Sequence, residues 1–121
     1  MSLRIRRAYD PPAADDGYRV LVDRLWPRGL AREAAHIDHW LRELAPSNEL
    51  RKWFAHDAAR WDAFRDRYAE ELRAPAAAGA LAALRGVIAT QAVVTLLHGA
   101  RDTTYNNAEA LRQWLDANPG P

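Results

Sequence analysis

Residues 18–29 place the strongest constraint on what this chain can fold into. Residues 20–22 (Val-Leu-Val) form a continuous apolar run, which is typical of a strand covered on both faces of a parallel sheet. Pro27 and Gly29 then prevent a regular β-ladder from continuing. The charged residues after the run are therefore expected at the carboxyl end of a core strand, where open α/β sheets bind ligands.

Two interpretations remain open for the side chains at this strand end. In the first, Asp23, Arg24, Trp26 and Arg28 contribute to a binding site. In the second, Asp23 and Arg24 form an ion pair that fixes the loop, and Trp26 covers the core.

Two further strands are predicted. Residues 92–97 form a second continuous apolar run and predict a buried strand. Apolar and charged residues alternate from Leu3 to Tyr9, which predicts a first strand with Arg4 and Arg6 on one face. This first strand could be antiparallel, because its connection to residues 18–23 is too short for a standard helical crossover.

Helical periodicity fills the rest of the chain. Apolar stripes predict a helix at residues 37–44, a short helix after Pro46, a long helix from His56 that Pro75 stops or kinks, a continuation over residues 76–89, and a last helix before residues 118–121. Residues 30–36 are either one helical turn or an ordered loop. Truncating Leu21, Leu96 or Leu97 should damage the core. The pattern predicts a single α/β domain over residues 1–121, with a small, mainly parallel three-stranded sheet flanked by about five helices.

Composition excludes several classes of function. The net charge is +1, from 17 basic and 16 acidic residues, which argues against a nonspecific nucleic-acid coat. The absence of Cys rules out disulfides, thiolate metal sites and Cys nucleophiles. The Asp residues of 10–16 and the pair His36 and His39 match no metal-site spacing, so we expect no metal and no cofactor. No apolar run approaches a membrane span, and we expect a cytoplasmic protein.

Polar loops follow both apolar strands, and they would meet if those strands are parallel neighbours. Arg side chains and the amino end of the last helix would then suit an anion, such as a phosphate or a carboxylate. Asp23 and His98 are weak candidates for catalytic groups, and His98 is alternatively a plain strand-end residue. The residues expected at this edge are Asp23, Arg24, Arg28, His98, Arg101, Thr103, Thr104 and Asn106.

Four stretches of the chain resemble the YeaO-like proteins of the domain-of-unknown-function family 488. They are residues 9–11 (Tyr-Asp-Pro), 16–29 (Asp-Gly-Tyr-Arg-Val-Leu-Val-Asp-Arg-Leu-Trp-Pro-Arg-Gly), 46–52 (Pro-Ser-Asn-Glu-Leu-Arg-Lys) and 95–106. The resemblance implies a compact bacterial α/β domain without an established activity. The residues that match the family pattern, and so become candidates for its site, are Asp23, Arg24, Trp26, Arg28, Ser47, Glu49, Arg51, Thr103, Thr104 and Asn106.

This chain departs from other branches of that family at two places. Those branches carry a Cys after the last strand and a Cys-His-Arg start to the final helix. Here the same places hold His98 and residues 105–107 (Tyr-Asn-Asn), so thiol chemistry does not transfer. Arg51 and Lys52 either lie over the mouth of the site or face water.

The leading hypothesis is a domain that binds a small anionic ligand through Arg24, Trp26, Arg28, Ser47, Arg51, Thr103, Thr104 and Asn106. Whether it is also an enzyme stays open at this stage. The alternative is a nucleic-acid-binding module that uses the Arg residues of strand one and the loops. A weaker third hypothesis is a protein-interaction domain with an exposed apolar patch that includes Trp26.

Overall fold

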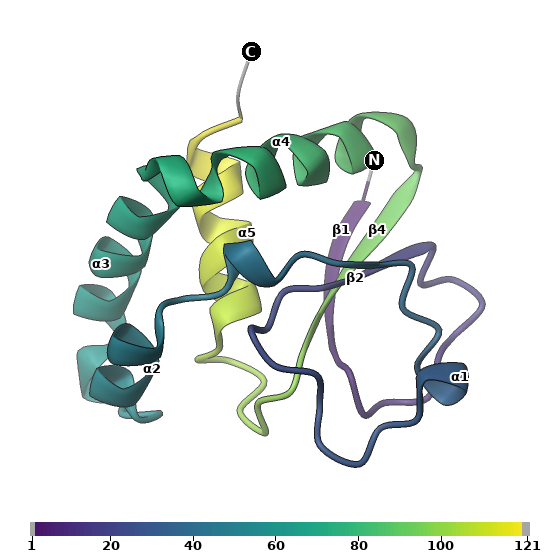
Figure 1. The fold of residues 1–121 in the computed structure, drawn as a ribbon, viewed down its shortest axis with the longest axis horizontal. Helices are drawn as coiled ribbons and strands as arrows, with labels where there is room; N and C mark the ends of the chain where they lie inside the picture. Colours follow the sequence, from purple (N-terminus) through teal and green to yellow (C-terminus); the bar gives the residue numbers. More distant parts are fainter. Residues whose placement is uncertain (1, 120–121) are drawn as a thin grey trace.

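The structure is a computed structural model that describes residues 2–119 (Figure 1). Its strands are β1 (Ser2–Arg7), β2 (Tyr18–Leu21), β3 (His39–Trp40) and β4 (Val93–His98). Its α-helices are α1 (Arg32–Ala35), α2 (Asn48–Phe54), α3 (Trp61–Arg73), α4 (Pro75–Thr90) and α5 (Asn107–Ala117), with 3-10 turns η1 (Arg42–Leu44) and η2 (Ala58–Arg60). Gly120 and Pro121, predicted to follow the last helix, lie outside the described residues. The predicted α/β class with five helices is confirmed.

The sheet is parallel, with β4 in its middle. The strand order is β1-β4-β2-β3, and every neighbouring pair is parallel. Because β4 separates β1 from β2, residues 8–17 run back across the sheet before β2 begins. This non-helical crossover explains how β1 is parallel despite its short connection.

A fourth strand corrects the predicted three-stranded sheet. The segment 37–44 is not one helix, because its apolar residues are divided between the two faces of the sheet: Ile37 and Trp40 pack with Leu21 on one face, whereas Leu41 and Leu44 belong to the main core. The backbone N–H of Leu41 donates to the Leu21 carbonyl oxygen at 2.9 Å, which fixes β3 beside β2. Pairing with β2 therefore overrides the local helical period.

The two faces of the sheet are covered differently. Leu96 of β4 faces the large core formed with helices α2 to α5, whereas Leu21 and Leu97 face a smaller core under the long connections. Figure 1 shows α3 and α5 on one side of the strands, α4 across the top of the view, and the loops with α1 on the other side. All three leucines are fully buried, as predicted.

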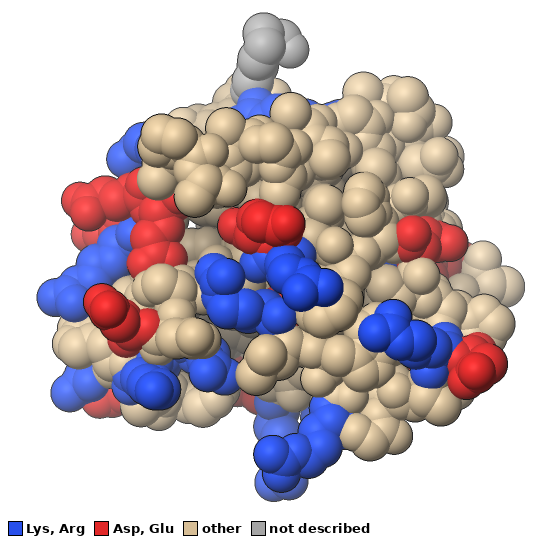
Figure 2. Space-filling view, in the orientation of Figure 1, with Lys and Arg blue, Asp and Glu red and all other residues tan. Residues whose placement is uncertain are grey.

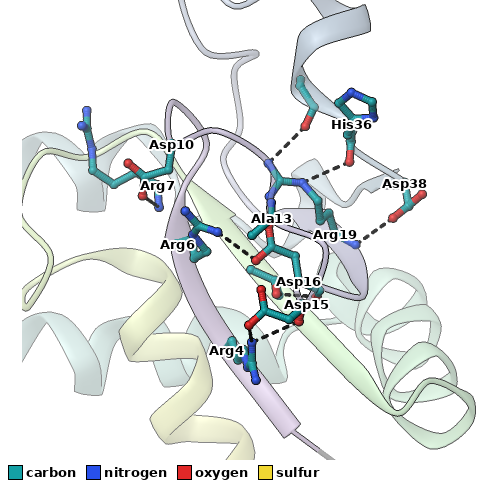
Figure 3. Close-up of polar contacts among 12 residues, drawn as sticks. Arg4, Arg6, Arg7, Asp10, Ala13, Asp15, Asp16, Arg19, His36 and Asp38 are labelled. Atoms are coloured by element: carbon teal, nitrogen blue, oxygen red, sulfur yellow. Dashed lines mark hydrogen bonds and ion pairs between the residues drawn. The ribbon is translucent and has the colours of Figure 1, made fainter.

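A buried ion-pair network holds the crossover of residues 8–17 against the sheet (Figure 3). Asp16 and Arg19 are paired and almost completely buried, and Arg6 donates to the second Asp16 oxygen at 3.0 Å. Arg4 pairs with Asp15 at 2.8 Å. Burial alone would raise the pKa of Asp16, but hydrogen bonds from the backbone and from the two guanidinium groups outweigh it and hold that pKa below its usual value. Arg6 and Arg19 thus hold Asp16 and its loop against the sheet, whereas the solvent-exposed pair of Arg4 adds little.

Helices α3 and α4 meet at Pro75, where the sequence predicts a stop or kink. The segments Ala58–Arg73 and Pro75–Thr90 are bent by 89° relative to each other. Within residues 2–119, no single helix is long and apolar enough to cross a membrane. Taken together, the two bent segments meet the length and composition criteria for a membrane span.

Candidate functional site

A cavity of about 370 Å³ lies at the carboxyl ends of β2 and β4. Residues 23–28, which follow β2, form one part of its wall. Other parts come from segments 45–56 and 99–107, with Tyr9 and Phe64 completing it. We call this cavity the carboxyl-edge pocket. It occupies the place where α/β sheets bind ligands.

Asp23 ties together the segments that form the pocket. Its Oδ2 accepts the backbone N–H of Gly99 at 2.7 Å, and its Oδ1 accepts the side-chain amide of Asn107 at 3.0 Å. The loop after β2, the loop after β4 and the first residue of α5 are thereby joined. A Cβ at position 99 would lie 3.1 Å from Asp23 Oδ2, so a glycine permits this close approach.

The environment of Asp23 disfavours its charged form. Burial raises its pKa, while the hydrogen bonds from Asn107 and Gly99 and the nearby charge of Arg51 lower it, and burial dominates. Asp23 forms no ion pair with Arg24 among residues 2–119, so that part of the alternative interpretation does not hold. The carboxylate therefore faces the pocket with its charge only partly compensated.

Three arginines line the same pocket: Arg24, Arg28 and Arg51. None of the three lies within 4.0 Å of a carboxylate oxygen in the described part of the chain. Arg24 donates to the Ala45 carbonyl at 3.2 Å, whereas Arg28 and Arg51 have exposed side chains. Lys52 is exposed and does not line the pocket.

Basic side chains also gather visibly on this side of the molecule. Figure 2 shows Lys and Arg over the middle and lower part of the drawn face, where Figure 1 places the carboxyl ends of the strands. The pocket itself holds three guanidinium groups and one carboxylate. Its charge is therefore positive by two units when Asp23 is ionised.

Aromatic side chains form much of the remaining wall. Phe54 and Phe64 stack with their ring centroids 4.3 Å apart, and both are buried. Tyr105 is half-buried, and Tyr9 is 41% exposed, so each presents ring surface toward solvent or a ligand. Trp26 also lines the pocket and packs on the smaller core, with its indole N–H donating to the Leu30 carbonyl at 2.7 Å.

His98 lies in a different cavity from Asp23. This second cavity, of about 390 Å³, is bordered by β1, His98, Thr103 and residues of α5. The His98 ring is 1% exposed, and its Nδ1 has no hydrogen-bond partner within residues 2–119. Burial, with a smaller effect of the Arg7 charge, lowers the pKa of His98 to about 4. The structure thus does not bring the two weak catalytic candidates together.

Two other predicted site residues, Ser47 and Asn106, act mainly at helix starts. Ser47 caps α2: its Oγ accepts the Leu50 N–H at 3.1 Å and donates to Glu71 at 2.7 Å. Asn106 lines the pocket and caps α5 by accepting the Glu109 N–H at 2.9 Å. Thr104 is exposed, and neither it nor Ser47 lines the pocket. Both caps match strong local sequence preferences.

The pocket collects six of the predicted residues: four from the loop after β2, one from within α2, and the residue that precedes α5. They are Asp23, Arg24, Trp26, Arg28, Arg51 and Asn106. Sequence reasoning missed other wall residues, namely Tyr9, Phe54, His56, Phe64, Tyr105 and Asn107. The sequence did contain one signal for Tyr9, because this residue lies in a stretch that carries the family resemblance. Phe54 and Phe64 carried only the signal of an apolar helix face.

The backbone beside His56 is unusual. Ala55 and His56 both have positive φ angles, of 46° and 58°, directly after α2. Such left-handed conformations are uncommon for residues other than glycine. They turn the chain so that His56 reaches the pocket, which no residue pattern in the sequence signals.

Comparisons with known proteins agree on one family. The family profile DUF488-N3i, described as "Inactive DUF488-N3 subclade", matches residues 2–119. The uncharacterized protein YeaO of Escherichia coli (strain K12) is 42% identical over 115 residues, covering 95% of this chain and 97% of that protein.

A mycobacterial protein is also similar to this chain over nearly its whole length. The uncharacterized protein Rv3073c of Mycobacterium tuberculosis (strain ATCC 25618 / H37Rv) is 40% identical over 114 residues, covering 94% of this chain and 93% of that protein. No solved structure matches the chain. The profile and the two full-length relatives establish that this chain is a YeaO-like member of the DUF488 family, in its DUF488-N3i subclade.

Proposed function

We propose that this domain binds a small anionic ligand, bearing a phosphate or a carboxylate, in the carboxyl-edge pocket. The observation that carries the proposal is the set of three pocket arginines without a carboxylate partner among residues 2–119. By contrast, Arg4, Arg6 and Arg19 of the sheet each pair with a carboxylate. Arginine presents a planar fork of N–H donors that matches phosphate and carboxylate oxygens.

The fold adds to the attraction. Helix α5 begins at Asn107, which lines the pocket, so the positive end of its dipole lies at the pocket wall. The aromatic and apolar side chains around the arginines lower the local dielectric constant, which strengthens a charge-assisted hydrogen bond. A pocket of about 370 Å³ is also in the size range of small-molecule sites.

The proposed role is binding without turnover. Within residues 2–119 no Cys, Ser or Thr lines the pocket, so it offers no thiol and no aliphatic hydroxyl as a nucleophile. The family resemblance implies that other branches carry Cys where this chain has His98 and residues 105–107. The subclade description "inactive" is consistent with a pocket kept for binding after catalytic groups were lost.

A ligand-dependent stability experiment tests the proposal. The thermal midpoint is measured with inorganic phosphate, benzoate or phenyl phosphate, for the parent and for Arg51→Gln and Arg28→Gln. These two side chains are exposed, so neither change should disturb folding. A probe at about a hundred times its Kd should add roughly 2.7 kcal/mol, or roughly 10 °C in midpoint.

The matched control is Arg73→Gln, which removes an exposed arginine outside the pocket. We expect a stabilising probe to act on the parent and on this control, and to lose most of its effect in both pocket variants. Stabilisation that is equal in all four proteins would contradict binding at the pocket arginines.

The nucleic-acid hypothesis receives less support from the geometry. Arg4 and Arg6 of β1 pair with Asp15 and Asp16, which leaves the loop arginines as candidates for phosphate contacts. A short single-stranded oligonucleotide in the same panel tests this hypothesis. Binding that weakens steeply with salt and involves several arginines outside the pocket would favour it over a small ligand.

A further inference from the structure

We infer that the ligand of the carboxyl-edge pocket is a phosphate monoester whose body carries hydroxyl groups and a planar ring, as in a ribonucleoside monophosphate. This inference rests on the proposed function and specifies the chemistry of the same pocket. Three features of the wall carry it: its charge, the acceptor capacity of Asp23 and its exposed aromatic rings.

The charge of the pocket favours a dianion. Arg24, Arg28 and Arg51 face a single carboxylate, that of Asp23. A phosphate monoester carries between one and two negative charges near neutral pH and offers three oxygens to the guanidinium forks. A simple carboxylate would leave part of the positive charge without a counter-charge.

Asp23 provides the second feature, because it can accept more hydrogen bonds than the protein gives it. An ionised carboxylate has about four acceptor positions. The structure fills one on each oxygen, from Gly99 to Oδ2 and from Asn107 to Oδ1. Burial raises the pKa of Asp23, which shows that these two donors do not fully compensate its charge.

The group that faces Asp23 should therefore be a hydrogen-bond donor. The anionic end of the ligand would be repelled by Asp23 and should lie with the arginines. A neutral diol is the simplest donor to a carboxylate, and acidic residues bind ribose hydroxyls in this way at the strand ends of other α/β folds. Asp23 thus fixes the direction of the ligand, with its hydroxyl groups at the carboxylate and its phosphate at the arginines.

The aromatic wall supplies the third feature. Tyr9, which is 41% exposed, and the half-buried Tyr105 line the pocket together with the stacked pair of Phe54 and Phe64. Stacking of a base on such a ring contributes roughly 1–3 kcal/mol, which corresponds to about fivefold to more than a hundredfold in affinity. The pocket volume of about 370 Å³ is suited to one such molecule rather than to a polymer.

Calorimetric titration with probes that lack one group at a time tests the inference. The four ribonucleoside 5′-monophosphates are titrated first, and the tightest is then compared with three relatives. The first relative lacks the phosphate (the nucleoside), the second lacks both hydroxyls (the 2′,3′-dideoxynucleoside monophosphate), and the third lacks the base (ribose 5-phosphate). We expect each deletion to weaken binding roughly tenfold or more.

Variants locate each contact. Asp23→Asn should reduce the difference between the ribonucleotide and its dideoxy form, because the charged acceptor is removed. The amide has a single acceptor oxygen, so it keeps the hydrogen bond from Gly99 or that from Asn107 and loses the other. Arg51→Gln should reduce the difference between the nucleotide and the nucleoside. Because the probe series is also measured on the parent protein, the inference stays testable if Asp23→Asn does not fold.

The outcomes separate this inference from the proposed function. Ribose 5-phosphate or the dideoxy probe binding as tightly as the nucleotide overturns the inference and leaves anion binding intact. So does a failure of all four nucleotides when phenyl phosphate or benzoate binds in an Arg51-dependent way. If no anion of either panel binds, both the proposed function and the inference are wrong.

Discussion

The buried imidazole of His98 makes the stability of this protein sensitive to mild acid. Its pKa is lowered to about 4 in the folded protein from an ordinary value of 6.5, mainly by burial. Between these values the unfolded chain binds a proton that the folded chain does not. The free energy of unfolding therefore falls as the pH falls from about 6.5 to about 4, and the loss is complete below the folded pKa. At about 1.4 kcal/mol for each pKa unit, the full loss is about 3 kcal/mol.

The assay compares urea unfolding at about pH 7 and about pH 4.5 for the parent and for His98→Gln. The parent should lose about 2 kcal/mol more than the variant between these two conditions, because Gln does not titrate. His39→Gln, at an exposed position, controls for loss of a histidine and should keep the parental pH dependence. An equal loss in the parent and in His98→Gln would refute the reasoning, since the acid sensitivity would then come from other groups.

Three further changes test how the fold is held together. Leu97→Ala should lower the free energy of unfolding by about 2–5 kcal/mol, because the side chain is fully buried; an unchanged urea midpoint would contradict its place in the core. Gly17→Ala should lower the free energy of unfolding by about 1–3 kcal/mol through backbone strain at φ +66°. The added Cβ would also clash with the Val93 carbonyl and increase this loss, and a thermal melt measures the total. Arg19→Met should cost about 3–5 kcal/mol by leaving Asp16 short of a partner, and a double-mutant cycle with Asp16→Asn should show strong coupling between the two positions.

Local patterns in the sequence were sufficient to predict most secondary-structure elements. The apolar runs predicted β2 and β4, and the apolar stripes predicted helices at α2, α3, α4 and α5, of which α2 and α5 begin at the capping residues Ser47 and Asn106. These signals are local because a strand must hide its own faces and a helix must satisfy its own first N–H groups. The two-residue strand β3 could not be predicted in this way, since it exists through its pairing with β2.

The sequence also predicted which edge of the sheet carries the polar cluster, but it identified only some of the residues that form this cluster. Arg24 and Arg28 follow β2 directly, so their position depends on a single strand. The partners of Asp23 lie 76 and 84 residues away along the chain, and nothing local signals that Gly99 and Asn107 converge on it. His98 was grouped with Asp23 because both end a strand, yet the structure places its ring in another cavity.

The sequence by itself thus determined most of the elements, the mainly parallel α/β class and the edge with an excess of arginine, because hydrophobic period, turn residues and charge are properties of adjacent positions. Only the tertiary structure decided that β4 inserts between β1 and β2, that residues 8–17 cross the sheet without a helix, and that aromatic rings from α2, α3 and three loops close the pocket. Each of these depends on which distant segments pack together. That choice minimises the exposed apolar surface of the whole chain rather than of any one segment.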